Sequence, residues 1–109
     1  MAELELTKKQ WGTMEEVQLH DGAPVQHFKV NPGGRLPLRN NKYHSEHWVV
    51  VRGVGRMHLD RQAFLMDEGS SVFIPARACH AIENLGEGVL RLVAVHYGSD
   101  WPRAVSAAE

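Results

Sequence analysis

Side chains that can bind a metal ion or transfer a proton fall at two-residue spacing near the middle of the chain. In the run HSEHWVVVRG, His44, Glu46 and Trp48 alternate with other residues. Successive side chains of a strand point to opposite faces, so in an extended segment these three share one face and His47 lies on the other. An imidazole and a carboxylate on one face suit metal ligation or general acid-base chemistry.

The elements that must position these side chains are short strands. From Trp11 onward, short apolar runs are separated by Gly, Pro, Asn and Asp, which is typical of an all-β sandwich or barrel. The Asp60–Arg61 step between two such runs predicts a tight hairpin. No segment of the sequence shows a sustained helical period. We expect strands over residues 25–30, 35–39, 47–52, 55–59, 62–66, 71–74, 80–84 and 89–97.

The bulk properties fit one small globular domain. The chain has 109 residues, of which 43% are hydrophobic and 23% charged, and its formal net charge is −1. These values are ordinary for a soluble globular protein. Neither a run of Lys and Arg nor a long apolar run is present, so we expect no nucleic-acid partner and no membrane partner. The N-terminus has no apolar signal segment and Cys79 is the single cysteine, which agrees with a cytoplasmic protein.

The run HWVVVRG, residues 47–53, is apolar on both faces of the expected strand. A strand with this pattern is covered on both sides. In a barrel this small, the outer side must meet another element or another chain, so the sequence predicts a homodimer.

Two segments resemble the paired motifs of the cupin family. The first motif of that family reads G-x5-H-x-H-x3/4-E-x6-G, and the residues here at the same spacing are Gly33, Arg39, Asn41, Glu46 and Gly53. The second motif reads G-x5-P-x-G-x2-H-x3-N, and its matching residues are Gly69, Pro75, Arg77, His80 and Asn84. Arg77 replaces the middle glycine of that motif.

The resemblance implies an all-β fold, the cupin double-stranded β-helix or jelly-roll barrel. We expect the cupin domain over residues 11–99, an N-terminal arm or edge strand over 1–10, and a short C-terminal tail over 100–109. The inward-facing strand residues at the open mouth of such a barrel form the binding site. By the resemblance, Glu46 and His80 face inward there.

The likeness extends to a particular cupin family. The strings NPGGRLPL, EHWVVVRG and VFIPARACHAIEN, with the early Trp11–Gly12 pair, are similar to the C-terminal domain of type II mannose-6-phosphate isomerase and GDP-mannose pyrophosphorylase, over roughly residues 9–99. The resemblance implies an aldose–ketose isomerase acting on mannose 6-phosphate and fructose 6-phosphate. Glu46 and His80 are then the expected catalytic residues. They would move a proton between C1 and C2 while a metal or another cation stabilises the enediolate.

Two positions depart from the family pattern. Where the family has metal-binding side chains, this chain has Arg39 and Asn41. A guanidinium stays protonated and cannot bind a metal, and an Asn offers only a neutral carbonyl oxygen. With His44 replacing a lost ligand, the set His44, Glu46 and His80 would suit one divalent Zn, Mn, Fe or Ni ion. The competing interpretation is that His44 lies in a loop and points to water.

Arg39 supports a further interpretation of the same site. Its guanidinium, paired with Glu46, would replace the charge of the metal and suit an anionic ligand such as a sugar phosphate. The simpler alternative is a rim arginine that extends to solvent. The candidate substrate-binding residues are Arg39, Asn41, Trp48 and His96, although Trp48 can also serve as a core residue.

Two functions therefore stay open. One is a mannose-6-phosphate isomerase-like enzyme with an altered metal site. The other is a non-catalytic cupin that binds a sugar, a sugar phosphate or another small anion. The fold alone does not distinguish them, because cupins support many chemistries.

Overall fold

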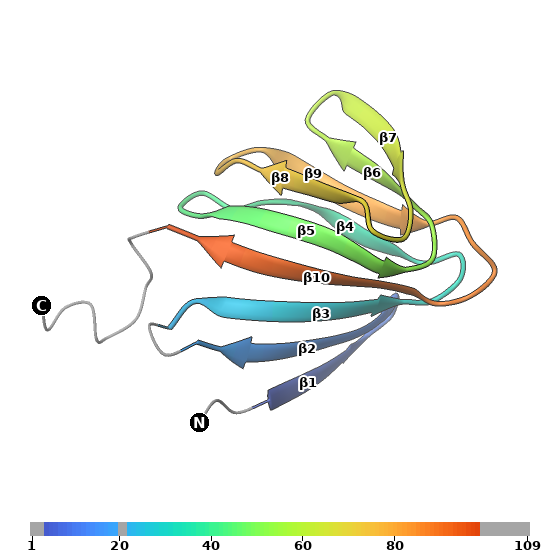
Figure 1. The fold of residues 1–109 in the computed structure, drawn as a ribbon, viewed down its shortest axis with the longest axis horizontal. Coiled ribbons are helices and arrows are strands. Elements are labelled where there is room, and N and C mark those ends of the chain that lie inside the picture. The colour runs from blue at the N-terminus through green and yellow to red at the C-terminus, as the bar shows by residue number, and fades with distance from the viewer. Residues whose placement is uncertain (1–3, 20–21, 99–109) are drawn as a thin grey trace, which may run out of the picture.

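The computed structural model describes residues 4–19 and 22–98, and its elements are all β-strands in two antiparallel sheets (Figure 1). The six-stranded sheet has the order β1-β2-β3-β10-β5-β8, and the four-stranded sheet has the order β4-β9-β6-β7. In the part of the chain described, no helix is long and apolar enough to cross a membrane. The strands are β1 Leu4–Lys9, β2 Gly12–Gln18, β3 Pro24–Val30, β4 Arg35–Asn40, β5 Ser45–Arg52, β6 Gly55–Leu59, β7 Gln62–Met66, β8 Ser71–Ile74, β9 Cys79–Asn84 and β10 Leu90–Tyr97.

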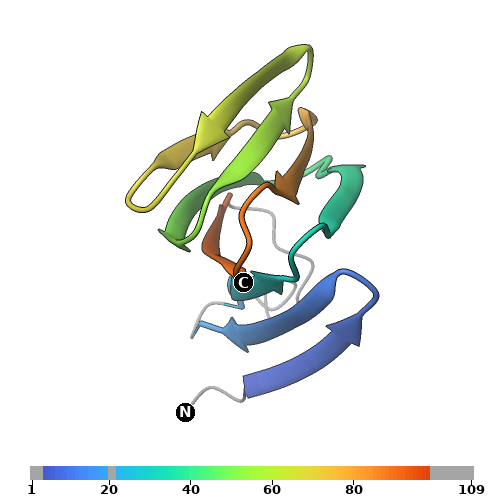
Figure 2. The same cartoon turned by 90° about the vertical axis from the view of Figure 1, so that its right-hand side faces the viewer.

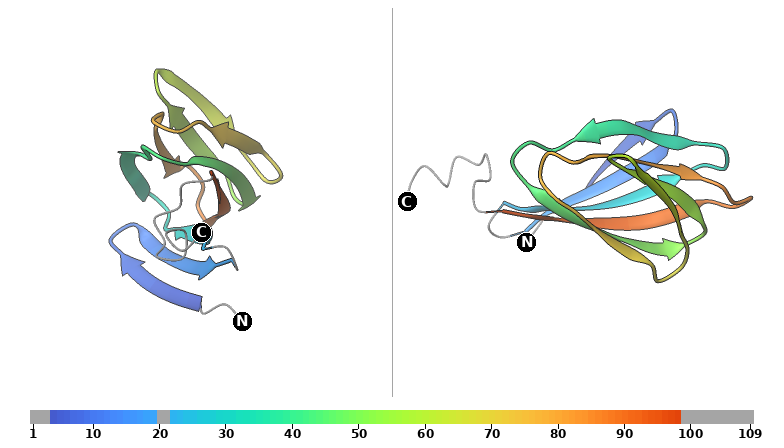
Figure 3. Two further views of the ribbon diagram at one scale, coloured as in Figure 1. Left: turned by 90° about the vertical axis from the view of Figure 1, so that its left-hand side faces the viewer. Right: turned by 90° about the horizontal axis from the view of Figure 1, so that it is seen from above.

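The two sheets enclose a single apolar core. Side chains that point inward from both sheets pack together, and Phe28, Trp48 and Leu92 are each at most 1% exposed. The end-on view in Figure 2 shows the β1–β2 and β6–β7 hairpins at opposite extremes of the molecule. Figure 3 shows the strands running along its length. The main core members are Phe28, Val30, Leu36, Trp48, Val50, Met57, Met66, Ile74, Ala78, Ile82, Leu90, Leu92 and Ala94.

The hairpin predicted at Asp60–Arg61 is confirmed. Leu59 and Gln62 pair across it, and Asp60 takes the left-handed backbone conformation, with φ 53°. The Asp60 carboxylate also accepts a hydrogen bond of 2.9 Å from the backbone N–H of Cys79. The turn therefore ties the β6–β7 hairpin to the start of β9, which positions His80.

The N-terminal strands are only partly visible in the sequence. For residues 1–10 the sequence predicts either an arm or an edge strand, and the structure has the edge strand β1 over Leu4–Lys9. The sequence does not predict β2, because GTMEEVQ mixes two glutamates with few apolar residues. It is a strand because β1 pairs along one of its sides and β3 along the other. The tail predicted over residues 100–109 lies outside the described residues.

Asn84, the last residue of the second motif, has a structural role. Its side-chain amide donates to the carbonyls of Val30 at 2.9 Å and Gly88 at 2.8 Å, and its Oδ1 accepts from the N–H of Gly86 at 2.8 Å. Asn84 is 5% exposed. A buried amide with these partners fixes the β9–β10 connection against β3.

Candidate functional site

The polar side chains of the interior gather at one end of the barrel. Glu46 lies near the start of β5 and is paired in register with His96 near the end of β10. On the facing sheet, His80 lies near the start of β9 and is paired with Arg39 of β4. Because neighbouring strands are antiparallel, these starts and ends meet at the same edge of the two sheets. Toward the opposite end the buried side chains are apolar, apart from Asn84 at the end of β9.

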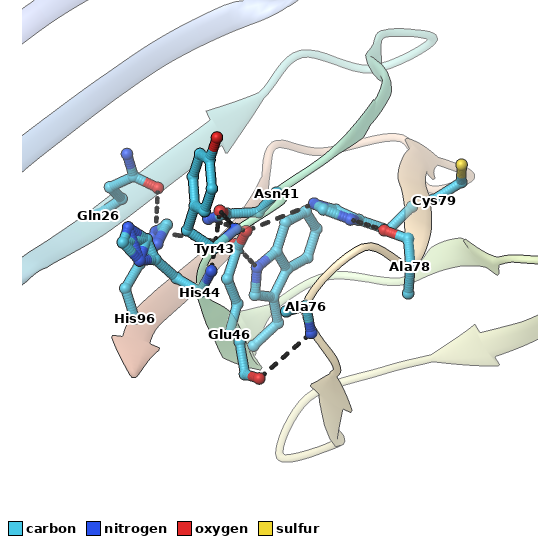
Figure 4. A network of polar contacts seen from close by, with 12 residues as sticks. Gln26, Asn41, Tyr43, His44, Glu46, Ala76, Ala78, Cys79 and His96 are labelled. Atoms are coloured by element: carbon cyan, nitrogen blue, oxygen red, sulfur yellow. Dashed lines mark hydrogen bonds and ion pairs between the residues drawn. The ribbon is translucent and has the colours of Figure 1, made fainter. Parts of the chain in front are cut away.

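The Glu46 carboxylate is the centre of this cluster and is 1% exposed (Figure 4). Its Oε1 accepts a hydrogen bond of 2.8 Å from Trp48 Nε1, and its Oε2 accepts a longer one of 3.5 Å from Asn41 Nδ2. The Nε2 atoms of His80 and His96 lie 3.7 Å from Oε2 and Oε1, respectively. A buried carboxylate is stable only with such partners, so these contacts hold Glu46 in place.

His80 faces Glu46 through one particular nitrogen. Its Nδ1 lies 3.1 Å from the backbone carbonyl of Ala78, which can only accept, so Nδ1 has the proton. Nε2 is then the nitrogen that faces the Glu46 carboxylate. The edge of the His80 ring also packs against Trp48, with 5.3 Å between ring centroids and an interplanar angle of 89°. Trp48 is thus both a core residue and a donor to Glu46.

His96 is buried on the other side of the carboxylate. Burial lowers the pKa of His96 below the ordinary 6.5, which the nearby Glu46 charge only partly opposes. The positive charge of Arg39 acts in the same direction as burial. His96 is therefore neutral at pH 7. Its Nε2 lies 2.9 Å from the side-chain oxygen of Gln26.

Asn41 and His44 shape the connection between β4 and β5. The Oδ1 atom of Asn41 accepts hydrogen bonds from the backbone N–H groups of Tyr43 at 3.2 Å and His44 at 3.1 Å. This local bonding is the usual role of Asn in a turn. His44 precedes the first residue of β5 and so lies in the connection, but it is only 6% exposed. Its imidazole is therefore part of the buried cluster.

Arg39 lies at the rim. Its cross-strand partner is His80, so both side chains belong to the same face of the small sheet, yet Arg39 is exposed whereas His80 is buried. The ion pairs of the described residues do not include one between Arg39 and Glu46. The donors to Glu46 are Trp48 and Asn41 instead.

Sequence reasoning missed Gln26. This residue is 8% exposed and lies on the inward face of β3, two residues before the core residue Phe28. Its Nε2 donates a hydrogen bond of 2.8 Å to Glu16 Oε1. The signal in the sequence was a polar residue at an inward position of the strand, where alternation predicts an apolar one.

The donor set for a metal is incomplete in this arrangement. The described residues contain no group of three or more His, Cys, Asp or Glu side chains placed to hold a metal ion. His80 has the backbone partner that metal-binding histidines usually have, and its Nε2 faces Glu46. The Nε2 atom of His96, however, is directed at Gln26. The side chains therefore offer one pair of candidate ligands, Glu46 and His80.

A surface cavity of about 560 Å³ lies away from this cluster. It is formed by the β5–β6 and β9–β10 connections, at the end of β5 opposite Glu46. Its charged lining residues are Arg52, Glu87 and Arg91. The cavity shares no lining residue with the Glu46 cluster, so we do not assign the site to it.

The two enclosing sheets and the buried Glu–His cluster at one end define a cupin. A predicted oxalate decarboxylase from Thermotoga maritima superposes with a TM-score of 0.74 at 22% identity, over 90% of this chain and 94% of that one. The CENP-C cupin domain of Drosophila melanogaster superposes with a TM-score of 0.78 at 14% identity, over 87% and 76%. At these identities the likeness shows the fold alone.

The sequence places the chain in one family of cupins. The family model described as mannose-6-phosphate isomerase C-terminal matches residues 3–102, so the chain belongs to this family. It is 35% identical over 89 residues to the alginate biosynthesis protein AlgA of Pseudomonas aeruginosa and 35% identical over 89 residues to a mannose-1-phosphate guanylyltransferase of Escherichia coli. The matches cover 82% of this chain but only 18% and 19% of those relatives.

Proposed function

We propose that this chain binds a sugar phosphate at the Glu46 end of the barrel and interconverts its aldose and ketose forms, as a mannose-6-phosphate isomerase does. The observation that supports this function is the buried carboxylate of Glu46, with an imidazole nitrogen 3.7 Å from each of its oxygens. Proton transfer between adjacent carbons needs a held base and a nearby acid, and this cluster supplies both.

The proposed chemistry moves two protons. Glu46 takes the proton from C2 of the open-chain aldose and returns it to C1, while the hydroxyl proton of O2 passes to O1 through an imidazole. The enediolate that forms between these transfers is stabilised by the hydrogen-bond donors of the cluster. Arg39, exposed at the rim, suits the phosphate group, because a guanidinium forms paired hydrogen bonds with phosphate oxygens.

Access to the site requires movement of the β4–β5 connection. Glu46 and His80 are each 1% exposed, and Asn41 of this connection contacts Glu46. We propose that residues 41–44 move aside when the sugar enters and close over it afterwards. Such closure excludes water from a reacting enediolate.

The alternative is a non-catalytic cupin that binds the same class of ligand. Arg39 and Asn41 at family ligand positions favour it, as does the incomplete donor set of the described residues. A reducing compartment such as the cytoplasm suits either function, because Cys79 is a free thiol.

One experiment separates the two functions. We would follow conversion of mannose 6-phosphate to fructose 6-phosphate by NMR, and binding of each sugar by calorimetry, for the wild type, Glu46→Gln and the exposed control Glu68→Gln. The isomerase function predicts conversion that Glu46→Gln lowers by a factor of about 100 or more, with Glu68→Gln unchanged. Binding without conversion supports the non-catalytic function, and absence of both contradicts the proposal.

Metal content tests the predicted divalent ion directly. Plasma mass spectrometry of the untagged protein would be compared for the wild type, His80→Ala and the control His58→Ala, because His58 pairs with Glu83 away from the cluster. A bound Zn, Mn, Fe or Ni ion predicts near one metal per chain, lost only in His80→Ala. No metal after incubation with these ions would favour the metal-free site.

A further inference from the structure

Two hydrogen bonds connect His96 of β10 to side chains of β3 and β2 in the same six-stranded sheet. Glu16 of β2 and Gln26 of β3 are directly opposite each other in the register. Gln26 Nε2 donates to Glu16 Oε1 at 2.8 Å, and His96 Nε2 lies 2.9 Å from Gln26 Oε1. Figure 4 shows the Gln26 side chain directed at His96. The series therefore runs from Glu16 through Gln26 and His96 to Glu46.

The chemistry of these groups fixes the direction of each bond. A carboxylate can only accept, so the amide nitrogen of Gln26 must be the atom that faces Glu16. The amide oxygen then faces His96, and because that oxygen can only accept, His96 must donate from Nε2. The opposite amide orientation would bring the oxygen of Gln26 against the oxygen of Glu16 and is disfavoured.

We propose that Gln26, oriented by Glu16, is a positioning residue that holds His96 with its proton on Nε2, so that this nitrogen donates to Gln26 and cannot accept a proton beside Glu46. This inference deepens the proposed function, on which its role with a ligand rests. His80 is held in the opposite sense, with its proton on Nδ1 toward Ala78 O. The two imidazoles beside Glu46 thus differ in protonation: His96 Nε2 has a proton, which it donates to Gln26, whereas His80 Nε2 faces Glu46 without one.

The division has a chemical consequence for the proposed reaction. The Nε2–H of His96 is used in the hydrogen bond to Gln26 Oε1, so His80 Nε2 is the imidazole nitrogen that can pass the O2 hydroxyl proton to O1. The same N–H prevents His96 Nε2 from serving as a base or as a metal ligand, since its lone pair is used in the N–H bond. Gln26 therefore acts through His96 and needs no contact with the ligand.

The test reads the His96 tautomer in the free protein. Long-range ¹H–¹⁵N NMR of ¹⁵N-histidine-labelled full-length chain at neutral pH distinguishes a proton on Nε2 from one on Nδ1, and His96→Gln assigns the signal. We expect the Nε2–H form to predominate in the wild type. The excess, meaning the population ratio of the Nε2–H to the Nδ1–H form, should fall about tenfold in Gln26→Met, because the amide that selects the Nε2–H form is lost. A wild-type His96 with its proton mainly on Nδ1 overturns the proposal.

A paired exchange separates positioning from a merely structural effect. In Glu16→Gln the amide at position 16 can turn either way, so the Nε2–H excess should fall. In the double variant Glu16→Gln with Gln26→Glu, the new carboxylate at position 26 accepts from both neighbours, and the excess should return. The exposed Gln62→Met on β7 is the control. Unchanged tautomer signals in Glu16→Gln and Gln26→Met would contradict the inference. The tautomer measurement needs no substrate. A negative result in the isomerase assay would therefore contradict the proposed function without contradicting the assignment of the His96 tautomer.

Discussion

At the residue scale, the main feature is a buried negative charge with a full set of neighbours. Glu46 is 1% exposed, and removing an unpaired carboxylate from water is costly. The donors Trp48 and Asn41 offset part of that cost. A cluster of buried titratable groups with a perturbed pKa, such as that of His96, is typical of functional sites, which is why we place the function there.

The lowered pKa of His96 predicts how stability depends on pH. Burial is its main cause, so above about pH 6.5 neither the folded nor the unfolded chain protonates this residue. Below that pH the unfolded chain binds a proton that the folded chain does not. We therefore expect the unfolding free energy to fall by up to about 1.4 kcal/mol per pH unit, until the lowered pKa is reached.

Urea unfolding between pH 7.5 and 5.5 measures this effect, with His96→Gln as the comparison. The variant should lose that part of the pH dependence. Glu15 has a lowered pKa because of its hydrogen bond with His27, but its stabilising effect is lost only below the ordinary pKa of 4.5, outside this window. Equal pH slopes in the two proteins would contradict the assignment to His96.

Arg77 is a second residue whose environment predicts a measurable effect. It replaces the middle glycine of the second motif and has a φ of 76°, which is unfavourable for a residue with a Cβ. Arg77→Gly should therefore raise the unfolding free energy by about 1 kcal/mol. This net gain is the backbone strain that glycine relieves, reduced by the greater conformational entropy of glycine in the unfolded chain. Thermal unfolding checks it. Arg77→Ala keeps the strain and should give no such gain, so an equal gain in both variants would be against the backbone explanation.

At the element scale, the pairing of β2 with β3 depends on one glycine. Gly12 has a φ of 152°, and a Cβ at this position would lie 1.8 Å from the backbone oxygen of Lys29. A backbone atom cannot move aside as a flexible side chain can. The site needs this pairing, because it places Glu16 opposite Gln26.

Gly12→Ala should accordingly lower the unfolding free energy by about 3 kcal/mol or more. Chemical denaturation measures the change, and hydrogen exchange should show loss of protection in β2 and β3. Gly88→Ala is the matched control, since a Cβ there would have no atom within 4 Å. Similar losses in the two variants would show that the close approach at Gly12 is not the cause.

At the scale of the whole molecule, the outer face of the six-stranded sheet exposes several large apolar side chains. Val49 of β5 is 38% exposed, Phe73 of β8 is 52% and Tyr97 of β10 is 46%. The rings of Phe73 and Tyr97 lie 6.4 Å apart. Contiguous exposed apolar groups favour association, which agrees with the two-faced pattern of residues 47–53.

The homodimer predicted from that pattern stays a prediction, and light scattering after size exclusion tests it. We expect twice the 12.2 kDa mass of one chain. Phe73→Lys should shift the protein toward the monomer, because a charge cannot be buried in an apolar interface. Leu65→Lys, at a 65% exposed position on the small sheet, is the control. A wild type that is monomeric at all concentrations would contradict the prediction.

The sequence by itself determined the fold class, most strand bounds and the face of Glu46. The alternation of apolar and polar residues and the positions of turn residues are local signals, and the spacing of the two motifs can be read directly from the sequence. Only the tertiary structure decided which strands pair and which side chains contact one another. β2 is a strand through its neighbours, Gln26 meets His96 across 70 positions of sequence, and Arg39 lies at the rim while Trp48 and Asn41 hold Glu46. These contacts depend on register and packing between distant strands, which no local pattern specifies.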